Sequence, residues 1–198
     1  MHVFRKANVL AIFSDRTSGD LSFFDVSRPS TFENWITLTT KLGLQSYLPF
    51  FLSQTHKDCI VDVSPGTAPG NQGSADAITV SEHRFPIGVF SADCLPVLIA
   101  GKKVLGAVHA SWKNSRLGIS GKIVNHLTEK FGESAGDLNI FMGPCIGQCC
   151  LELGEEVMHQ IITDDQSFSA CSSKGKKWHL DLRALNVIQC IQSGASIG

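Results

Sequence analysis

The sequence lacks any apolar run long enough to cross a lipid bilayer. Its N-terminus also lacks the apolar core and small-residue cleavage site of a secretory signal peptide. The 17 lysines and arginines are scattered and nearly balance the 18 aspartates and glutamates, so no basic stripe of the kind that nucleic-acid binding requires is present. We therefore expect a soluble, cytoplasmic protein that binds neither membranes nor nucleic acids.

The sequence also lacks a disulfide framework, because its seven cysteines are odd in number and show no paired spacing. In a reducing compartment such cysteines are mostly packed thiols, with a few recruited as metal ligands or nucleophiles. We find no internal repeat and no linker, and 198 residues of which 43% are hydrophobic suffice for one core. Residues 1–198 are therefore expected to form a single domain.

Hydrophobic periodicity and turn residues divide the chain into short strands and amphipathic helices. Residues 64–74, rich in glycine, proline and polar side chains, are expected to form a long surface loop. The predicted strands are 7–13, 47–54, 59–63, 75–80, 95–100, 104–110 and 138–142. The predicted helices are 31–42, 115–131, 155–163 and 181–192.

The apolar runs 95–100 and 104–110 flank a Gly-Lys-Lys break and predict a hairpin. If Gly101 begins a two-residue type II′ loop, paired residues have numbers that sum to 203. Cys94 then lies directly opposite His109 on the same face, with Cβ atoms about 4.5–5.5 Å apart. At that distance a thiolate and an imidazole can share a metal ion or a proton.

Cations and small donors follow this hairpin. Lys113 and Arg116 lie in the turn that leads into the helix predicted at 115–131, where free backbone N–H groups and the helix dipole favour anions such as phosphate. A solvated capping segment is the alternative interpretation. Arg16 is a third candidate for phosphate binding, and its alternative is an ordinary loop arginine. Asp76, inside an apolar strand pattern, and Asp93 are candidates for proton transfer or for orienting a histidine.

Two histidines and one cysteine around an open position form a known catalytic zinc arrangement, and the same donors also serve blue copper. His56 has the right side chain for such a site, although a histidine at the end of an apolar strand is often a packed edge residue. The chain lacks the tight cysteine pairs of a zinc finger. From the residues alone, only Cys94 and His109 are linked, and His56 stays unassigned.

Five ordered motifs resemble those of the YfiH/YlmD family, which is also known as a laccase-domain or multicopper polyphenol oxidase family and as purine nucleoside phosphorylase. The motifs are Gln-Thr-His at 54–56, Ala-Asp-Ala at 75–77, Ala-Asp-Cys-Leu-Pro-Val at 92–97, Val-His-Ala-Ser-Trp-Lys at 108–113 and Gly-Pro-Cys-Ile-Gly-Gln-Cys-Cys at 143–150. The resemblance implies a layered α/β (α+β) domain, with mixed sheets flanked by helices, related to the catalytic domains of cytotoxic necrotising factors. It also implies a zinc ion held by His56, Cys94 and His109.

The resemblance further implies a zinc-dependent enzyme that cleaves adenosine, inosine, guanosine and methylthioadenosine with phosphate and deaminates adenosine. Its partners would be a small-molecule nucleoside and phosphate, the latter held near Lys113 and the N-terminus of the helix that follows it. Cys94, His109, Asp76 and Asp93 are the candidate catalytic residues, and we expect Asp93 to orient a histidine.

The chain departs from the family pattern at several positions. The family's His-Ala-Gly-Trp-Arg-Gly is His-Ala-Ser-Trp-Lys-Asn here, so a lysine point charge replaces a bidentate guanidinium at position 113. Leu151 stands where a tyrosine is common, and relatives continue through further strands beyond Gly198. We therefore expect the domain to lack the family's C-terminal strands.

Three alternatives remain open. Cys94 could act as a metal-free nucleophile with His109 as its base, which would make a cysteine hydrolase. A polyphenol oxidase of the laccase type is a second alternative, although its copper cluster needs many histidines and the chain has seven. The third is a catalytically impaired binding homologue, which the change at Lys113 favours.

Overall fold

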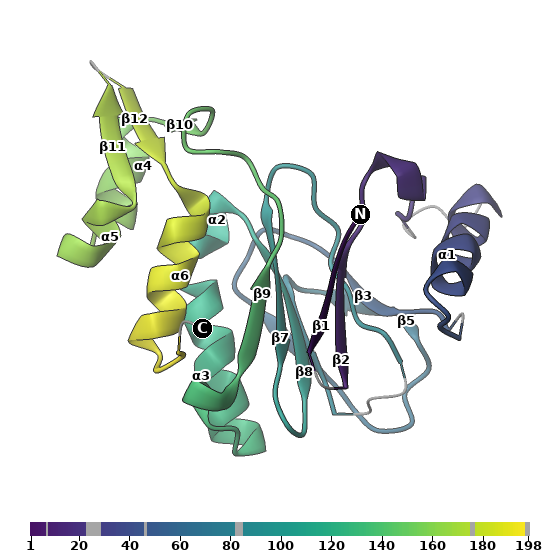
Figure 1. Ribbon diagram of the computed structural model, residues 1–198. Coiled ribbons are helices and arrows are strands. Elements are labelled where there is room, and N and C mark those ends of the chain that lie inside the picture. Colours follow the sequence, from purple (N-terminus) through teal and green to yellow (C-terminus); the bar gives the residue numbers. More distant parts are fainter. Residues whose placement is uncertain (7, 23–28, 46, 82–84, 175–176, 197–198) are drawn as a thin grey trace.

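A five-stranded mixed sheet lies at the centre of the computed structural model, which describes residues 1–6, 8–22, 29–45, 47–81, 85–174 and 177–196 (Figure 1). The strand order is β4-β6-β8-β7-β9. The β4 and β6 strands are parallel, and the other neighbours are antiparallel. The bounds are β4 (Ile60–Val63), β6 (Ala77–Val80), β7 (Leu95–Ala100), β8 (Leu105–Ala110) and β9 (Asn139–Met142).

Helices α3 (Ile119–Phe131) and α6 (Leu182–Gln192) lie side by side on one face of this sheet (Figure 1). The apolar stripe of α3 is fully buried in the core on this face. A Cβ at Gly106 in β8 would lie 3.3 Å from Ile123 of α3, so this glycine lets the helix approach the strand closely. The 3.6-residue periodicity in the sequence thus marks the face that meets the sheet.

The opposite face of the sheet is covered by β3 (Phe50–Ser53) and β5 (Gly70–Ser74), which pair in parallel (Figure 1). The hairpin of β1 (His2–Lys6) and β2 (Val9–Phe13) packs against β9 through the rings of Phe4 and Phe141. Phe50 is fully buried in the core on this face, together with Ile78. The layered α/β architecture with mixed sheets flanked by helices is therefore confirmed.

The remaining elements lie around these layers. No helix in the described part of the chain is both long and apolar enough to span a membrane. A small sheet of order β10-β12-β11 packs with α4 and α5 near the start of α6 (Figure 1). The bounds are 3-10 helix η1 (Arg16–Ser18), α1 (Pro29–Lys41), α2 (Trp112–Ser115), 3-10 helix η2 (Ala135–Asp137), β10 (Glu152–Leu153), α4 (Glu155–Ile161), α5 (Asp165–Ser169), β11 (Cys171–Lys174) and β12 (Lys177–Leu180).

The hairpin of β7 and β8 forms, but the predicted register is wrong by two residues. Pro96, not Cys94, lies opposite His109, and paired residues have numbers that sum to 205. Side chains alternate between faces with a period of two, so a shift of two residues keeps Cys94 and His109 on the same face. The two are diagonal neighbours rather than directly opposed.

The connecting loop explains this error. It spans residues 101–104 and is closed by the N–H of Gly101 donating to the carbonyl of Val104 at 2.9 Å, and Gly101 does not have a positive φ. The buried carboxylate of Glu133 accepts the backbone N–H groups of Lys102 and Lys103 at 3.0 and 2.6 Å. A Cβ at Gly101 would lie 2.5 Å from this carboxyl group. The glycine therefore serves the close approach of Glu133, not a type II′ turn.

Two further predictions differ from the structure. The expected loop 64–74 contains the polar strand β5, which pairs with β3 although it has no apolar alternation. The helix expected at 115–131 is split into α2 and α3, because Gly118 between them has a left-handed backbone with φ of 79°. The predicted strand 7–13 begins at Ala7, which lies outside the described residues, and β2 covers Val9–Phe13.

Candidate metal centre

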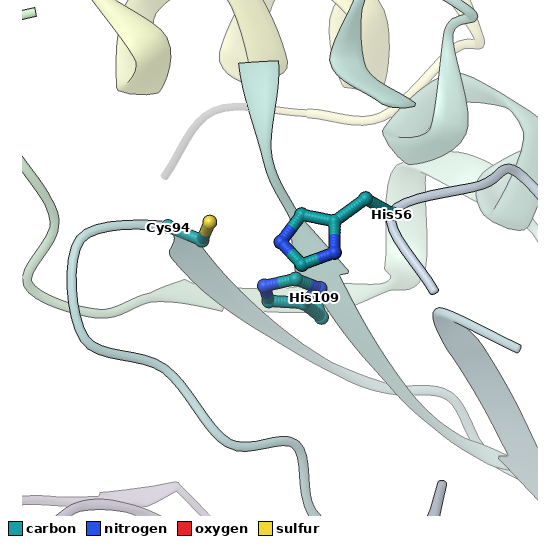
Figure 2. A group of neighbouring side chains, drawn as sticks. All are labelled: His56, Cys94 and His109. Carbon is teal, nitrogen blue, oxygen red and sulfur yellow. The ribbon is translucent and has the colours of Figure 1, made fainter. Parts of the chain in front are cut away.

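Three side chains from separate parts of the chain converge at one end of the central sheet. His109 lies in β8, Cys94 directly precedes β7, and His56 lies in the connection between β3 and β4. Their ligand atoms all lie within 4.8 Å of one another. Figure 2 shows the thiol of Cys94 beside the two imidazole rings, whose planes are nearly perpendicular at 87°. His109 is buried, Cys94 is half-buried and His56 is exposed, so the group opens to solvent on the His56 side.

Asp76 forms hydrogen bonds that hold both histidines in place. Its side chain is fully buried, and its Oδ1 lies 2.8 Å from His109 Nδ1. The same carboxylate accepts the backbone N–H groups of Thr55, His56 and Lys57 at 2.9–3.0 Å. Because a carboxylate only accepts, His109 carries a proton on Nδ1, and Nε2 is the nitrogen through which it would bind a metal.

The backbone of His56 is held in an unusual conformation. Its φ of 59° is the only positive φ of a non-glycine residue in the described part of the chain. Successive N–H groups at Thr55, His56 and Lys57 point at the Asp76 carboxylate, an arrangement that a left-handed residue makes possible. Such a conformation costs about 1 kcal/mol or more and persists only where its surroundings impose it. Asp76 thus determines the position of one ligand and the orientation of another.

In the absence of a metal, the surrounding groups shift the pKa values of the two histidines in opposite directions. Burial opposes the charged form of His109, but hydrogen bonds and charges of Asp76 and Cys94 raise its pKa to about 9. Burial and the nearby cations of His109 and Lys113 lower the pKa of His56, against the attraction of Asp76. Burial also opposes the ionised form of Asp76, but hydrogen bonds from His109 and the backbone lower its pKa to about 2. An ionised carboxylate therefore faces the His109 ring over the whole neutral pH range.

The donor set of this group matches the chemistry of a zinc site with an open coordination position. Two imidazole nitrogens and one thiolate are ligands that zinc accepts, and they also suit copper. A carboxylate that accepts the ring N–H not used for the metal, as Asp76 does for His109, is a regular feature of zinc-binding histidines. The three residues thus form a group that could bind a metal ion.

Comparisons with known proteins identify the family of this chain. Residues 25–197 match the family described as multi-copper polyphenol oxidoreductase laccase. The chain belongs to this family. It is 32% identical to a purine nucleoside phosphorylase of Clostridium acetobutylicum over 142 residues, which is 71% of this chain and 58% of that protein. It is 31% identical to a purine nucleoside phosphorylase of Rickettsia conorii over 167 residues, which is 82% of this chain and 67% of that protein.

Solved structures of the family share the fold. The crystal structure of YfiH from Bacillus licheniformis aligns with a TM-score of 0.75 and 24% identity over 84% of this chain and 67% of that one. The crystal structure of YlmD from Geobacillus stearothermophilus aligns with a TM-score of 0.71 and 21% identity, over 83% of this chain and 65% of that chain. These matches support the resemblance to the YfiH/YlmD family. The chain spans about half to three fifths of the length of the first curated relatives that it matches, 58% of one and 50% of the next.

The residues that depart from the family motif after His109 are linked to one another. Asn114 is fully buried, and its Oδ1 accepts the backbone N–H of Ser111 at 2.7 Å, while the Ser111 hydroxyl accepts the N–H of Asn114. The Asn114 amide donates to the carbonyl of His109 at 2.9 Å and to that of Lys57 at 3.1 Å. Ser111 and Asn114 therefore form a capping box, and Asn114 also ties the His56 segment to β8.

The sequence motif gave no signal for this role of Asn114 beyond the replacement of a glycine. Asp93, which we expected to orient a histidine, has an exposed side chain, and only its backbone carbonyl has a described bond, from the N–H of Ile146 at 2.8 Å. Asp76 takes the orienting position instead. A role for Asp93 in proton transfer stays a prediction.

The three predicted phosphate-binding cations lie in different surroundings. Lys113, in α2, lies over the ring of Trp112 and close enough to affect the pKa of His56. Arg116 is exposed and bonds to the side chain of Gln160. Arg16 is exposed in η1, and within the described residues no hydrogen bond or ion pair joins it to the three ligand candidates. Of the three, Lys113 is the cation that lies near the candidate metal ligands.

The loop between β9 and β10 also borders the centre. Gly143 donates its N–H to the carbonyl of Pro96 at 2.9 Å, and a Cβ there would collide with the ring of Phe13. Arg183 donates to the carbonyl of Gly143 at 2.9 Å. Burial raises the pKa of the Cys145 thiol, which the nearby Arg183 opposes. A side chain at position 143 would therefore meet Phe13 and Pro96, so the glycine lets the loop pass close to β2 and β7.

Proposed function

We propose that this chain is a zinc-dependent purine nucleoside phosphorylase with its metal held by His56, Cys94 and His109. The observation that carries the proposal is the convergence of their ligand atoms within 4.8 Å, with the carboxylate of Asp76 bonded to His109. Relatives that are named purine nucleoside phosphorylase support the activity. Because the chain spans only part of their length, its own activity and substrates are proposals.

Zinc, when bound, would supply Lewis-acid chemistry, which polarises an oxygen or activates a water molecule. The chain's own residues prepare the centre for it. Asp76 keeps the proton of His109 on Nδ1, and the exposed side of His56 leaves room for a small-molecule substrate. Three protein ligands with one side open to solvent are the arrangement of a catalytic zinc site, whereas a structural zinc site is closed by four protein ligands.

Lys113 is the residue that we propose to bind phosphate. Phosphorolysis forms a bond from a phosphate oxygen to the anomeric carbon of ribose and breaks the bond from that carbon to the purine, which leaves as the free base. Lys113 neutralises the attacking phosphate as a compact charge but lacks the fork of an arginine. The proposed substrates are adenosine, inosine, guanosine and methylthioadenosine, and Arg116 and Arg16 remain predicted phosphate contacts.

The test is incubation of the zinc-loaded protein with inosine or adenosine, with and without phosphate, followed by chromatography. Phosphorolysis should give free base and ribose 1-phosphate only when phosphate is present. Deamination of adenosine should give inosine whether or not phosphate is present. His109→Ala should abolish both, and Lys113→Ala should raise the KM for phosphate by about tenfold, equivalent to one lost charged hydrogen bond of about 1.4 kcal/mol. No product under any metal condition would overturn the proposal in favour of a binding homologue.

A metal-free cysteine hydrolase is a second candidate, because Cys94 lies close enough to His109 to affect its pKa. Activity that survives complete removal of metal by a chelator and disappears in Cys94→Ser would support this alternative. The laccase alternative has less support. Within the described residues one group of three metal-binding side chains is found, whereas a multicopper oxidase needs a further cluster. Oxidation of a phenolic substrate by copper-loaded protein would reopen it.

A further inference from the structure

Two neighbouring cysteines lie in the turn that leads from the loop at 143–150 into β10. Cys149 and Cys150 are both exposed, and their Sγ atoms are 3.3 Å apart. Among the described residues, each thiol has the other as its hydrogen-bonding partner. Neither belongs to the group of His56, Cys94 and His109. The proposed phosphorylase chemistry therefore leaves this pair of thiols without a role.

The backbone around the pair is held on both sides. The N–H groups of Cys150 and Leu151 donate to the carbonyl of Gly147 at 2.9 and 3.1 Å. The ring of His179 in β12 lies 3.1 Å from the carbonyl of Gln148 through its Nδ1. The turn thus presents two thiols side by side on a fixed backbone, which reduces the entropy lost when both react with one ligand.

The other five cysteines differ from this pair. Cys190 is buried, Cys94, Cys145 and Cys171 are half-buried, and Cys59 is exposed but has no neighbouring thiol among its described contacts. An internal disulfide needs two accessible thiols within reach of each other. Among the described thiol contacts, this requirement is met at Cys149 and Cys150. Between adjacent residues a disulfide closes a strained eight-membered ring, because consecutive Cα atoms lie about 3.8 Å apart, and a strained disulfide is more easily reduced.

We propose that Cys149 and Cys150 form a dithiol site that is oxidised to a vicinal disulfide by small-molecule disulfides. One thiolate attacks a sulfur of the small disulfide and expels one small thiolate, which leaves a mixed disulfide on the protein. The second thiolate then attacks the protein-bound sulfur and expels the other small thiol. The protein loses two hydrogen atoms and two electrons, and one small disulfide becomes two thiols.

Either thiol can attack first, because both are exposed and each lies within reach of the other. The remaining thiol then closes the ring. Oxidation of this pair leaves the three candidate metal ligands unchanged, so the site is independent of the proposed function.

The test treats the folded protein with oxidised glutathione in excess over reduced glutathione and maps the peptides by mass spectrometry. We expect the peptide with both cysteines to lose the mass of two hydrogen atoms. Cys149→Ser and Cys150→Ser should each stop at one glutathione adduct, because no second thiol is present. Cys59→Ser is the matched control and should still form the vicinal disulfide, and circular dichroism checks that each variant is folded.

A trivalent arsenical is a second probe that does not depend on redox state. Phenylarsine oxide bridges two close thiols with release of water, and wild-type protein should retain it through dialysis while either serine variant loses it. Two separate glutathione adducts on the wild-type pair would overturn the proposal. Retention of the arsenical by both serine variants, or a disulfide that links Cys145 instead, would overturn it as well.

Discussion

Asp76 and Asn114 fix the segment that carries His56 through opposite kinds of hydrogen bond. Asp76 accepts N–H groups of this segment, and Asn114 donates to its carbonyl at Lys57. Both side chains are fully buried and both also bond to His109, one to its ring and one to its carbonyl. The distance between the two histidine ligands therefore depends on two residues that do not face the proposed metal.

The sequence predicted only part of this arrangement. Alternation of strand residues placed Cys94 and His109 on one face, and this holds despite the error in register because the shift was even. His56 was assigned only by family resemblance, since its position depends on hydrogen bonds to Asp76, which is 20 residues away in the sequence. Long-range polar contacts of this kind leave no periodic pattern in a sequence.

Asn114→Ala should weaken zinc binding by about 10–100-fold, as loss of an outer-shell partner of a metal ligand does. Asn114→Asp keeps the size and the acceptor for Ser111 but loses the two donated bonds, so it should weaken binding as well. Competition with a chromophoric chelator measures the affinity.

Asn186→Ala is the matched control, because Asn186 is also fully buried and bonds Ser115 and Ser120 away from the ligands. It should lower the melting temperature without changing zinc affinity. Equal losses of affinity in the Asn114 and Asn186 variants would show that Asn114 acts only on stability.

Helix α3 is attached to the edge strand β4 by the carboxylate of Asp62. This side chain accepts bonds from Thr79, His126 and Lys130, two of which lie in α3. Burial opposes the charge of Asp62, but these three donors lower its pKa below the ordinary value of 3.8. The sequence predicted both the strand and the helix, but not the contact that fixes one against the other.

Asp62→Asn should lower the free energy of unfolding at pH 7 by about 1–2 kcal/mol, because hydrogen bonds to a charged group are lost. A lowered pKa stabilises the fold above about pH 4, and this contribution disappears as the pH falls through the folded-state value. The free energies of unfolding of the wild type and the variant, measured by urea denaturation at each pH, should therefore converge below pH 3.8.

Asp58→Asn serves as the control, since Asp58 forms an ion pair with Lys122 of the same helix nearer the surface. Such a pair contributes about 0–1 kcal/mol. A difference between wild type and Asp62→Asn that does not change with pH would contradict the role of the charge.

The central layers of the molecule follow from strong sequence patterns, whereas its periphery does not. The strand Leu95–Ala100 and the start of α6 after Asp181 lie where apolar runs and capping residues predicted them. The small sheet of β10, β11 and β12 was missed because its strands are two to four residues long and mostly polar. Short polar strands form through tertiary contacts, which override local propensity.

Burial across the molecule predicts an order of thiol reactivity. Burial raises the pKa of Cys190 to about 12 and raises that of Cys171 as well, which keeps both thiols protonated at pH 8.5. Iodoacetamide at this pH should therefore modify Cys59 well before Cys190 in the folded protein, and mass spectrometry of the peptides follows each rate. In 6 M guanidinium (about the concentration that unfolds most domains) the rates should become equal. Rapid labelling of Cys190 in the folded protein would contradict the packing of α6 against α3.

The zinc content of the purified protein tests the metal centre most directly. After dialysis against metal-free buffer, we expect about one zinc ion per chain, as three ligands around one open position predict. Cys94→Ala and His109→Ala should lose this zinc, while Cys59→Ala, which removes an exposed thiol outside the group, should retain it. Wild-type protein that binds no zinc even after incubation with it, or a Cys94→Ala variant that keeps the full amount, would contradict the assignment of the centre.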